Sequence, residues 1–280
     1  MILKNIPKSA KIALSPSTRF SKAAAMNLAD RIILVTRPEP GASESARLIA
    51  RHGGVPLLAP VMTIQPMADP LPFQHAMATL DRFDAVLLTS ANGARAFVAA
   101  LPEGVTPPPL FAVGHKTARL LTNRGWTPQV PERPMGGESL GKTVLERFPA
   151  ARSFLFPRAE EGREELIGVL EQAGKQVATI PVYRSVPVER LPAAILQRLP
   201  EVDALPFFSP RTAELFLDLL PQGPASLPET AVIAALSPLT AEALSRRGVR
   251  VDLTATGSDG EGMIRALIDY WSRWSNAPAS

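Results

Sequence analysis

Polar and cationic side chains follow short apolar runs throughout this 280-residue chain, at points where a strand would end and a helix begin. A helix N-terminus attracts anions, because its first backbone N–H groups are unpaired and its dipole is positive there. Several such positions around one cleft predict a site for a ligand rich in carboxylates. The candidate ligand-binding residues are Arg37, Thr89, Ser90, Asn92, Lys116, Arg158, Ser209, Arg211, Ser237 and Thr240.

The hydroxyl residues and two of the arginines also have a purely structural interpretation. Ser or Thr just before a helix commonly caps it, by accepting a hydrogen bond from a backbone N–H of the first turn. For Arg37 and Arg158 the alternative is a salt bridge that supports the fold, with Glu39 and Glu160 as the nearby carboxylates.

Residues 136–143 read Gly-Gly-Glu-Ser-Leu-Gly-Lys-Thr and match the phosphate-binding pattern G-x-x-x-x-G-K-[ST]. The context argues against nucleotide binding, because a phosphate loop leaves a buried strand directly, whereas Pro131 and Pro134 intervene here. The overlapping G-x-S-x-G pattern of hydrolases, centred on Ser139, fails for the same reason.

The composition does not support metal binding, a catalytic triad or a cofactor site. The chain has no cysteine, and its three histidines are scattered without metal-ligand spacing, so we expect no metal, no catalytic triad and no cofactor. His115 alone lies at a predicted strand end, where it can contact a ligand.

The positive charge of the chain lies at its front. The formal net charge is +4, and residues 1–30 carry all of it, so the remainder is neutral and offers no electrostatic footprint for nucleic acid. We expect residues 1–30 to be an N-terminal extension that is either disordered or included through a misassigned start codon. No stretch approaches the ~20 apolar residues that span a bilayer.

The second part of the chain repeats the first at an offset of about 120 residues. Residues 37–61 correspond to 158–182, residues 84–90 to 203–209, and residues 117–125 to 240–248. In the first copy we expect strands at 32–35, 55–59, 85–88, 110–113 and 128–130, separated by helices such as 44–51 and 117–124. Gly53 and Gly125 suit the helix ends.

This alternation predicts an α/β fold made of two similar, doubly wound, flavodoxin-like parallel-sheet domains. In such sheets ligands bind beyond the carboxyl ends of the strands, where the candidate residues lie.

An ordered series of short motifs runs through residues 31–272. It comprises Val35-Thr-Arg-Pro38, Leu88-Thr-Ser-Ala-Asn92, Ala112-Val-Gly114 with Thr117-Ala118, Phe156-Pro-Arg158 with Gly162-Arg163-Glu164, Pro181-Val-Tyr183-Arg184, Phe207-Phe-Ser-Pro210 and Thr240-Ala241. Each motif is loose, but the ordered set resembles that of the uroporphyrinogen-III synthase family.

The resemblance implies that the chain starts in one domain, completes the other and returns. Domain 1 would comprise residues 31–61 and 185–275, and domain 2 residues 62–184. A two-stranded hinge would join them, with the active cleft between.

The resemblance also implies the reaction. Hydroxymethylbilane would lose its hydroxyl as water and close to uroporphyrinogen III, with inversion of the terminal pyrrole and without a cofactor. By similarity, Tyr183 would assist the leaving hydroxyl, while Ser90, Ser209, Thr240 and nearby backbone amides would hold carboxylates.

One departure keeps an alternative open. Ser237 stands where the family usually has glycine, and Leu239 where a hydroxyl residue is common, so a Cβ could narrow the site. The alternative is a non-catalytic tetrapyrrole-binding or regulatory relative.

We further expect a cytoplasmic monomer that contacts neither nucleic acid nor membrane and receives its substrate from hydroxymethylbilane synthase.

Overall fold

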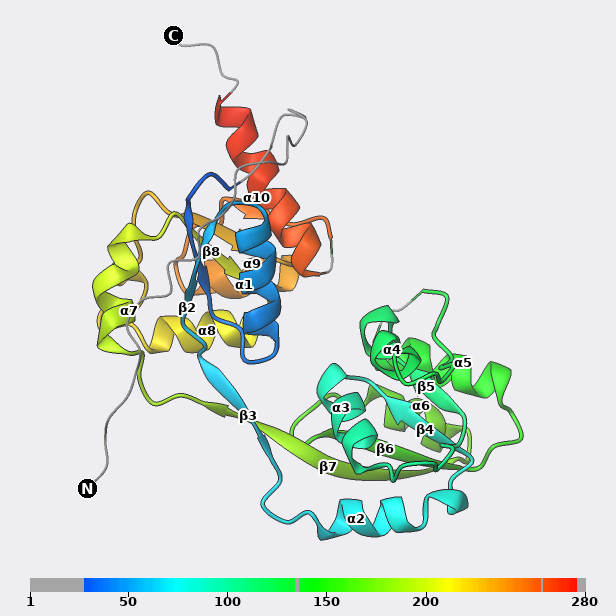
Figure 1. The fold of residues 1–280 in the computed structure, drawn as a ribbon. Helices are drawn as coiled ribbons and strands as arrows, with labels where there is room; N and C mark the ends of the chain where they lie inside the picture. The colour runs from blue at the N-terminus through cyan, green and yellow to red at the C-terminus, as the bar shows by residue number, and fades with distance from the viewer. Residues whose placement is uncertain (1–27, 134–135, 258, 276–280) are drawn as a thin grey trace, which may run out of the picture.

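The computed structural model describes residues 28–133, 136–257 and 259–275, which form two lobes, each built on a five-stranded sheet (Figure 1). Lobe A contains both ends of the described chain, and lobe B contains its middle. The predicted α/β class with parallel sheets is confirmed.

All strands of the lobe A sheet are parallel, and their spatial order is β10-β9-β8-β1-β2. Counted along this lobe the order is 2-1-3-4-5, which is the flavodoxin-like order. The strands are β1 (Ile32–Val35), β2 (Val55–Leu58), β8 (Ala204–Phe207), β9 (Val232–Ala235) and β10 (Leu253–Thr254).

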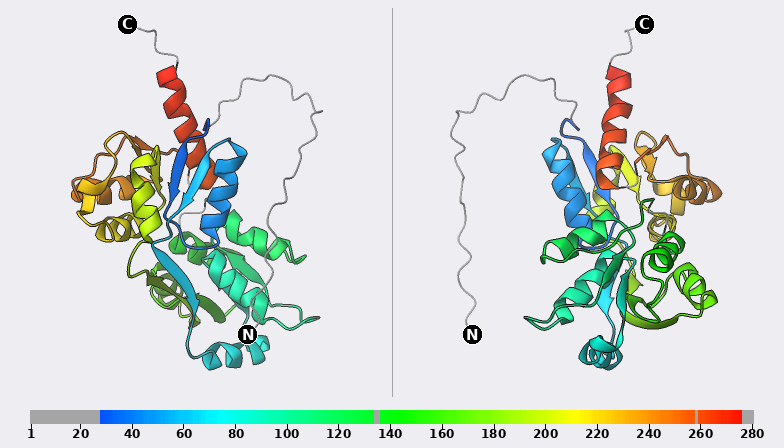
Figure 2. Two further views of the ribbon diagram at one scale, coloured as in Figure 1. Left: turned by 60° about the vertical axis from the view of Figure 1, so that its left-hand side comes forward. Right: turned by 90° about the vertical axis from the view of Figure 1, so that its right-hand side faces the viewer.

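Helices cover both faces of this sheet, because β1, β8 and β9 are too apolar to meet water on either side. One core cluster joins the sheet to α1 (Gly41–Arg51) and α10 (Gly260–Ser275). A second joins the opposite face to α7 (Ala193–Arg198), α8 (Pro210–Asp218) and α9 (Pro238–Arg246). Helix α10 extends past the sheet, away from lobe B (Figures 1 and 2).

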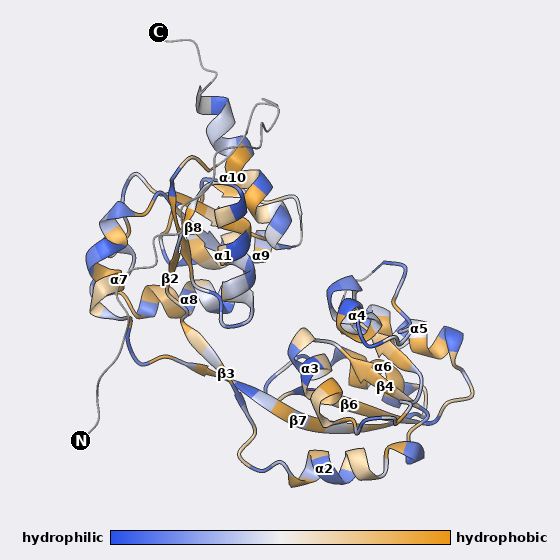
Figure 3. Cartoon of the chain, viewed as in Figure 1, coloured by the Kyte–Doolittle hydropathy of each residue, from blue (hydrophilic) through white to orange (hydrophobic). Residues whose placement is uncertain are grey.

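Lobe B repeats this plan, with strand order β3-β7-β6-β4-β5. Its strands are β3 (Met62–Pro66), β4 (Ala85–Leu88), β5 (Leu110–Ala112), β6 (Ser153–Ala159) and β7 (Gln176–Pro187). One face packs on α2 (Leu71–Ala78), α3 (Ala91–Ala100) and α4 (His115–Thr122), and the other on α5 (Gly137–Arg147) and α6 (Glu165–Gln172). Apolar residues are concentrated on the central strands, as Figure 3 shows. Short 3₁₀ turns lie at Leu80–Arg82, Leu199–Glu201 and Gly223–Ser226.

The sequence repeat is visible in these sheets. Strands β6 and β7 hold the places that β1 and β2 hold in lobe A, and β4 and β5 hold those of β8 and β9. Gly53 and Gly125 have positive φ angles of 77° and 81° just after α1 and α4, as their predicted helix-ending role requires.

Two strand predictions need correction. The expected strand at 128–130 is reduced to a single bridge between Phe111 and Gln129, because Pro128 and Pro131 cannot donate to a ladder. The lobe B sheet is also not wholly parallel, since β3 runs antiparallel to β7. Local sequence patterns do not fix the direction of β3, because it depends on how the chain crosses between lobes.

That crossing uses β3 and the end of β7. The two strands pair from Met62 opposite Pro187 to Pro66 opposite Tyr183, forming a ribbon between the lobes (Figure 1). Met62 belongs to the lobe A core, although its strand belongs to the lobe B sheet. The ribbon is therefore anchored at the lobe A end by packing.

At the edge of each sheet opposite the candidate site, an aspartate carboxylate accepts hydrogen bonds from backbone N–H groups at the start of a neighbouring strand. Oδ2 of Asp84 accepts hydrogen bonds from the backbone N–H groups of Arg152 (2.7 Å) and Ser153 (2.9 Å). Its repeat equivalent, Asp203, accepts one from Ile32 N at 2.7 Å. The pKa of Asp84 is lowered, chiefly by these backbone hydrogen bonds.

Leu28, which the expected boundary at residue 30 leaves in the extension, is fully buried in the lobe A core. Its backbone N–H donates to His52 O at 2.6 Å. The body of lobe A therefore includes residues 28–30, while the rest of the expected extension lies outside the described residues. Within the described ranges, no helix combines the length and the apolarity needed to cross a bilayer.

Candidate functional site

In each lobe the chain turns to opposite sides of the sheet after two adjacent central strands, β1 and β8 in lobe A, β6 and β4 in lobe B. Ligands of doubly wound sheets bind at such points, beyond the carboxyl ends of the strands. Arg37 and Ser209 follow β1 and β8, and Arg158 and Ser90 occupy the corresponding positions in lobe B. These four predicted residues therefore lie at two equivalent switch points.

The lobe B switch point contains a hydrogen bond between predicted residues that are distant in sequence. The Tyr183 hydroxyl donates to Ser90 Oγ at 3.1 Å. The same oxygen caps α3 by accepting from Gly93 N at 2.9 Å. Because Ser90 Oγ accepts both bonds, the proton of its own hydroxyl stays available for a ligand.

A cavity of about 320 Å³ opens beside this pair, and Thr89, Ser90, Arg158 and Tyr183 all line it. Arg158 is only 6% exposed. Its NH1 lies 3.7 Å from Glu164 Oε1, so its carboxylate partner is Glu164 and not Glu160. Glu164 is itself largely exposed, so a ligand carboxylate can replace it without stranding a buried charge.

Arg37 has the corresponding environment in lobe A. Its guanidinium stacks over the Phe208 ring at 4.3 Å, and NH1 donates to Ser45 Oγ at 3.1 Å. The pKa of Arg37 is lowered, mainly because burial disfavours the charged form, while nearby Glu44 acts in the opposite direction. A carboxylate ligand would offset the free-energy cost of burying this positive charge. Glu39, the expected partner, instead accepts hydrogen bonds from Ser43.

Both arginines are enclosed by a glycine four residues further along the chain. A Cβ on Gly41 would lie 2.9 Å from Arg37 Nε, and one on Gly162 would lie 2.7 Å from Arg158 NH2. Gly41 and Gly162 are equivalent in the sequence repeat, so both lobes build the same arginine cradle. A larger residue at either position would push the guanidinium out of place.

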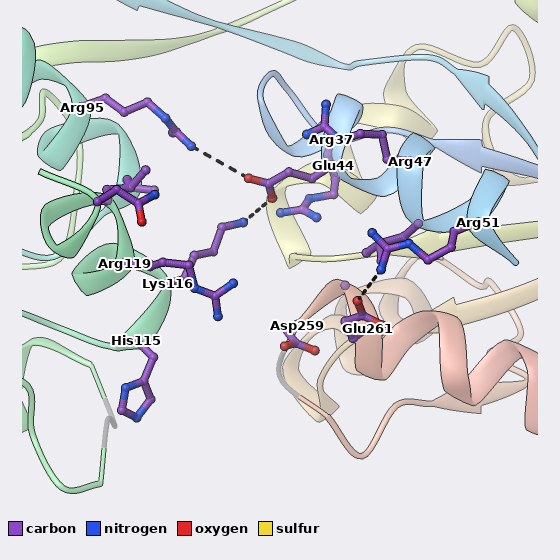
Figure 4. Close-up of a pocket in the computed structure, with 15 residues that line it drawn as sticks. Arg37, Glu44, Arg47, Arg51, Arg95, His115, Lys116, Arg119, Asp259 and Glu261 are labelled. Carbon is purple, nitrogen blue, oxygen red and sulfur yellow. Dashed lines mark hydrogen bonds and ion pairs between the residues drawn. The ribbon is translucent and has the colours of Figure 1, made fainter.

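A second cavity, of about 420 Å³, lies between the lobes and is strongly cationic (Figure 4). Its charged lining groups from lobe A are Arg37, Glu44, Arg47, Arg51, Asp259 and Glu261, and those from lobe B are Arg95, Lys116 and Arg119. Cations outnumber carboxylates in this lining. His115 also lines the cavity, as its predicted position at a strand end suggested. The arrangement suits a ligand with several carboxylates.

Two ion-pair groups connect the lobes. Lys116 Nζ lies 2.5 Å from Glu44 Oε2, and Arg95 NH2 lies 3.9 Å from Glu44 Oε1. Arg211 NH1 lies 3.6 Å from Glu161 Oε2. Lys116 and Arg211, both predicted as ligand-binding residues, are thus brought to the interface between the lobes.

The remaining predicted residues form local structure. Asn92 Oδ1 accepts a hydrogen bond from Arg95 NH1 at 3.0 Å, which orients that guanidinium on α3. Ser209 caps α8 by accepting from Thr212 N at 3.2 Å, and Ser237 caps α9 by accepting from Thr240 N at 3.3 Å. Thr240 is fully buried, and its hydroxyl pairs with Ser237 Oγ at 3.0 Å. In this conformation Thr240 supports the cap and is not presented to a ligand.

Ser237 occupies an extended backbone conformation, with φ −147° and ψ 160°. Any residue adopts this conformation, so the serine causes no strain where the resembling family usually has glycine. The serine side chain gives α9 the same cap that Ser209 gives α8.

Five charged residues that line the interlobe cavity were not predicted from the sequence, because they lie on helix faces and not at strand ends: Glu44, Arg47, Arg51, Arg95 and Arg119. Their spacing in the sequence could have indicated them. Glu44, Arg47 and Arg51 recur at the spacing of one helical face, as do Lys116 and Arg119. That pattern indicates a charged helix face, but it does not reveal that two such faces oppose one another.

The phosphate-loop pattern forms part of helix α5, which begins at Gly137. Lys142 lies in the second turn, where its Nζ contacts Glu138 Oε1 at 2.6 Å on the exposed helix surface. Ser139 Oγ donates to Gly136 O at 2.9 Å within the same helix end. The segment is therefore helical and not a loop that encloses a phosphate.

Comparison with known proteins gives a consistent result. A family model described as "Uroporphyrinogen-III synthase HemD" matches residues 43–265. The uroporphyrinogen-III synthase of Synechococcus elongatus is 28% identical over 88% of this chain and 97% of its own length, and that of Chlorobaculum parvum is 23% identical over 85% and 98%. Solved structures of the synthases from Thermus thermophilus (20% identical, a mutant form) and Helicobacter pylori (18% identical) each match with a TM-score of 0.55. They cover 87% and 86% of this chain and 99% of their own chains, and they share the fold.

Proposed function

The chain belongs to the uroporphyrinogen-III synthase family, and we propose on that basis that it cyclises hydroxymethylbilane to uroporphyrinogen III. It is a cyclising lyase of tetrapyrrole and haem biosynthesis. The reaction loses the substrate hydroxyl as water and inverts the terminal pyrrole. The observation that carries the proposal within the site is the cationic cavity between lobes, together with an equivalent enclosed arginine at the switch point of each lobe.

The substrate carboxylates would bind to cations from both lobes. Arg37 and Arg158 are enclosed by protein and already partly desolvated, so a carboxylate bound to either gains a strong charge-assisted hydrogen bond. Lys116 and Arg211 are more exposed and would attract carboxylates arriving from solvent. Ser90, Thr89 and the N-termini of α3, α8 and α9 supply neutral donors. Binding at several points fixes the flexible chain in one conformation, which is what ring closure with inversion requires.

Tyr183 would act on the leaving hydroxyl. Its phenol now donates to Ser90, and both groups line the lobe B cavity. When the substrate hydroxyl enters, the phenol can turn its proton toward that oxygen while Ser90 keeps Gly93 as a partner. The C–O bond then breaks with departure of water and leaves an electrophilic methylene carbon. The terminal pyrrole attacks this carbon through its substituted α-carbon to give a spiro intermediate, and rearrangement of that intermediate inverts the ring. One pyrrole proton is then lost and can return to the Tyr183 phenolate, so the net change is the loss of water. Electrons balance without an oxidant or a reductant.

We assign residues 28–61 and 185–275 to one domain and residues 62–184 to the other, with a two-stranded hinge at β3 and the end of β7. The pairing of β3 with β7 and the placement of the core clusters support this division. Rotation at the hinge would admit the substrate between the lobes and then close them around it.

The remaining parts of the proposal concern how the enzyme works in the cell. It would act as a monomer, with residues from both lobes of one chain binding the substrate in the interlobe cavity. Direct transfer from hydroxymethylbilane synthase would limit unassisted closure of the substrate. The absence of cysteine suits the reducing cytoplasm.

The test is a coupled assay in which freshly generated hydroxymethylbilane is supplied and the type I and type III isomers are separated. We expect type III product to form at a rate proportional to enzyme concentration. Type I product alone, formed at the rate of the enzyme-free reaction, would refute the activity and favour a non-catalytic tetrapyrrole-binding relative. Sedimentation at the assay concentration tests the monomer.

A further inference from the structure

Glu44 places a carboxylate of the protein among cations that would otherwise be open to a ligand. It projects from α1 of lobe A, and its two oxygens contact Lys116 and Arg95 of lobe B (Figure 4). Burial lowers the pKa of Arg37, and the negative charge of Glu44 partly offsets that lowering. A single carboxylate thus interacts with three cations of the interlobe cavity.

The contacts of Glu44 have the geometry of a bound ligand carboxylate. One oxygen accepts a hydrogen bond from Lys116 Nζ, and the other forms a longer ion pair with Arg95 NH2 at 3.9 Å, so both oxygens face cations of the opposite lobe. Glu44 remains 30% exposed and Lys116 57% exposed, so both can be solvated when they separate. The contact can therefore break without leaving a buried charge unpaired.

The alternative is that Glu44 simply supports the fold. The hydrogen-bond and ion-pair partners of its side chain, however, belong to the other lobe. Helix α1 is attached to lobe A by Ala42, Ser45 and Ile49. The helix thus needs no contact from Glu44 to pack.

We propose that Glu44 is a stand-in for a substrate carboxylate: it occupies Lys116 and Arg95 in the free enzyme and is displaced when hydroxymethylbilane binds. The inference rests on the proposed function for the identity of the ligand. Because the same cations cannot pair fully with both carboxylates, Glu44 lowers the affinity for the substrate. It also protects the open cavity from small anions that cannot displace it.

The experiment compares the parent with Glu44→Gln, which keeps the side-chain shape and removes the charge. We expect the KM for hydroxymethylbilane to fall by about two- to fivefold, the range that the loss of an exposed ion pair produces, with little change in kcat. Lys116→Gln should raise KM. In the Lys116→Gln background, Glu44→Gln should lower KM less than it does in the parent, because its main partner is gone.

Glu242→Gln is the matched control. It also removes a carboxylate from an exposed ion pair, with Arg246 at 3.0 Å, but that pair lies within α9 and does not line the cavity. Its KM should equal that of the parent. Raising the salt concentration from about 0.05 to about 0.5 M should bring the KM values of the parent and Glu44→Gln together, since salt screens exposed pairs.

An unchanged KM in Glu44→Gln would show that Glu44 is an ordinary surface charge, and a raised KM would show that it ties the lobes together. Either result overturns the proposal.

A calorimetric titration with 1,2,3,4-butanetetracarboxylate gives a readout that does not depend on catalysis. If the parent makes no type III isomer, the proposed function fails, yet tighter binding of this probe by Glu44→Gln would still show that Glu44 competes with carboxylates.

Discussion

Tyr183 and Ser90 are 93 residues apart in sequence, and their hydroxyl oxygens lie 3.1 Å apart in the structure. The contact forms because β7 and β4 flank β6 in the lobe B sheet, so that their carboxyl ends open on the same side. Ser90 is also the cap of α3. The catalytic candidate is thus linked directly to a helix N-terminus that can bind an anion.

Tyr183→Phe should lower kcat by on the order of 10²-fold, because phenylalanine keeps the ring but cannot donate a proton to the leaving hydroxyl. The free energy of unfolding should fall by only about 1 kcal/mol, the value of one hydrogen bond. Isomer-resolved turnover and urea unfolding measure the two effects. Tyr270→Phe, the same change at the other tyrosine of the chain, should leave turnover at the parent rate. Type III product from Tyr183→Phe at the parent rate would mean that Tyr183 has only a packing role.

Arg158→Gln should raise the KM about tenfold, since a buried charge-assisted contact with a substrate carboxylate is worth more than ~1.4 kcal/mol. Steady-state kinetics with hydroxymethylbilane measures this change. Arg152→Gln is the control, because Arg152 is an exposed arginine at the opposite end of β6. Equal KM values for the two variants would show that Arg158 does not contact the substrate.

Ser237→Gly restores the residue that the family usually has and should destabilise the protein by only a few tenths of a kcal/mol, whereas Ser237→Ala should cost about 1 kcal/mol through loss of the α9 cap. Urea midpoints of the two variants measure this difference. The turnover of Ser237→Gly should match that of the parent, because the extended backbone at this position accommodates a Cβ without strain. A several-fold rise in turnover would instead show that the serine narrows the substrate site.

Asp84→Asn should weaken the pH dependence of stability in acid. The pKa of Asp84 is lowered in the folded protein, so its charged form stabilises the fold above the ordinary carboxyl pKa, and that contribution is lost as the pH falls through the folded value. The free energy of unfolding of the parent should therefore drop more steeply below pH ~4 than that of Asp84→Asn. Parallel curves from urea titrations at several pH values would show that the strand-start hydrogen bonds do not depend on the carboxylate charge.

Local patterns in the sequence determined the repeat, the α/β class, most strand positions and the caps at Ser90, Ser209 and Ser237. These features follow from hydrophobic periodicity, glycine at helix ends and hydroxyls before helices, all of which act over a few residues. The same patterns placed Arg37 and Arg158 at equivalent strand ends. They did not show that Gly41 and Gly162 enclose the two guanidinium groups.

Tertiary structure decided which of these positions meet. The antiparallel direction of β3 depends on how the chain crosses between lobes. Glu44 meets Lys116 only because helices from different lobes face one another across the cavity. Thr240, which the sequence suggested as a ligand-binding hydroxyl, is fully buried and hydrogen-bonds to Ser237, the cap of α9. Such contacts depend on how packed elements are arranged in space, which residue type and spacing along one chain segment do not encode.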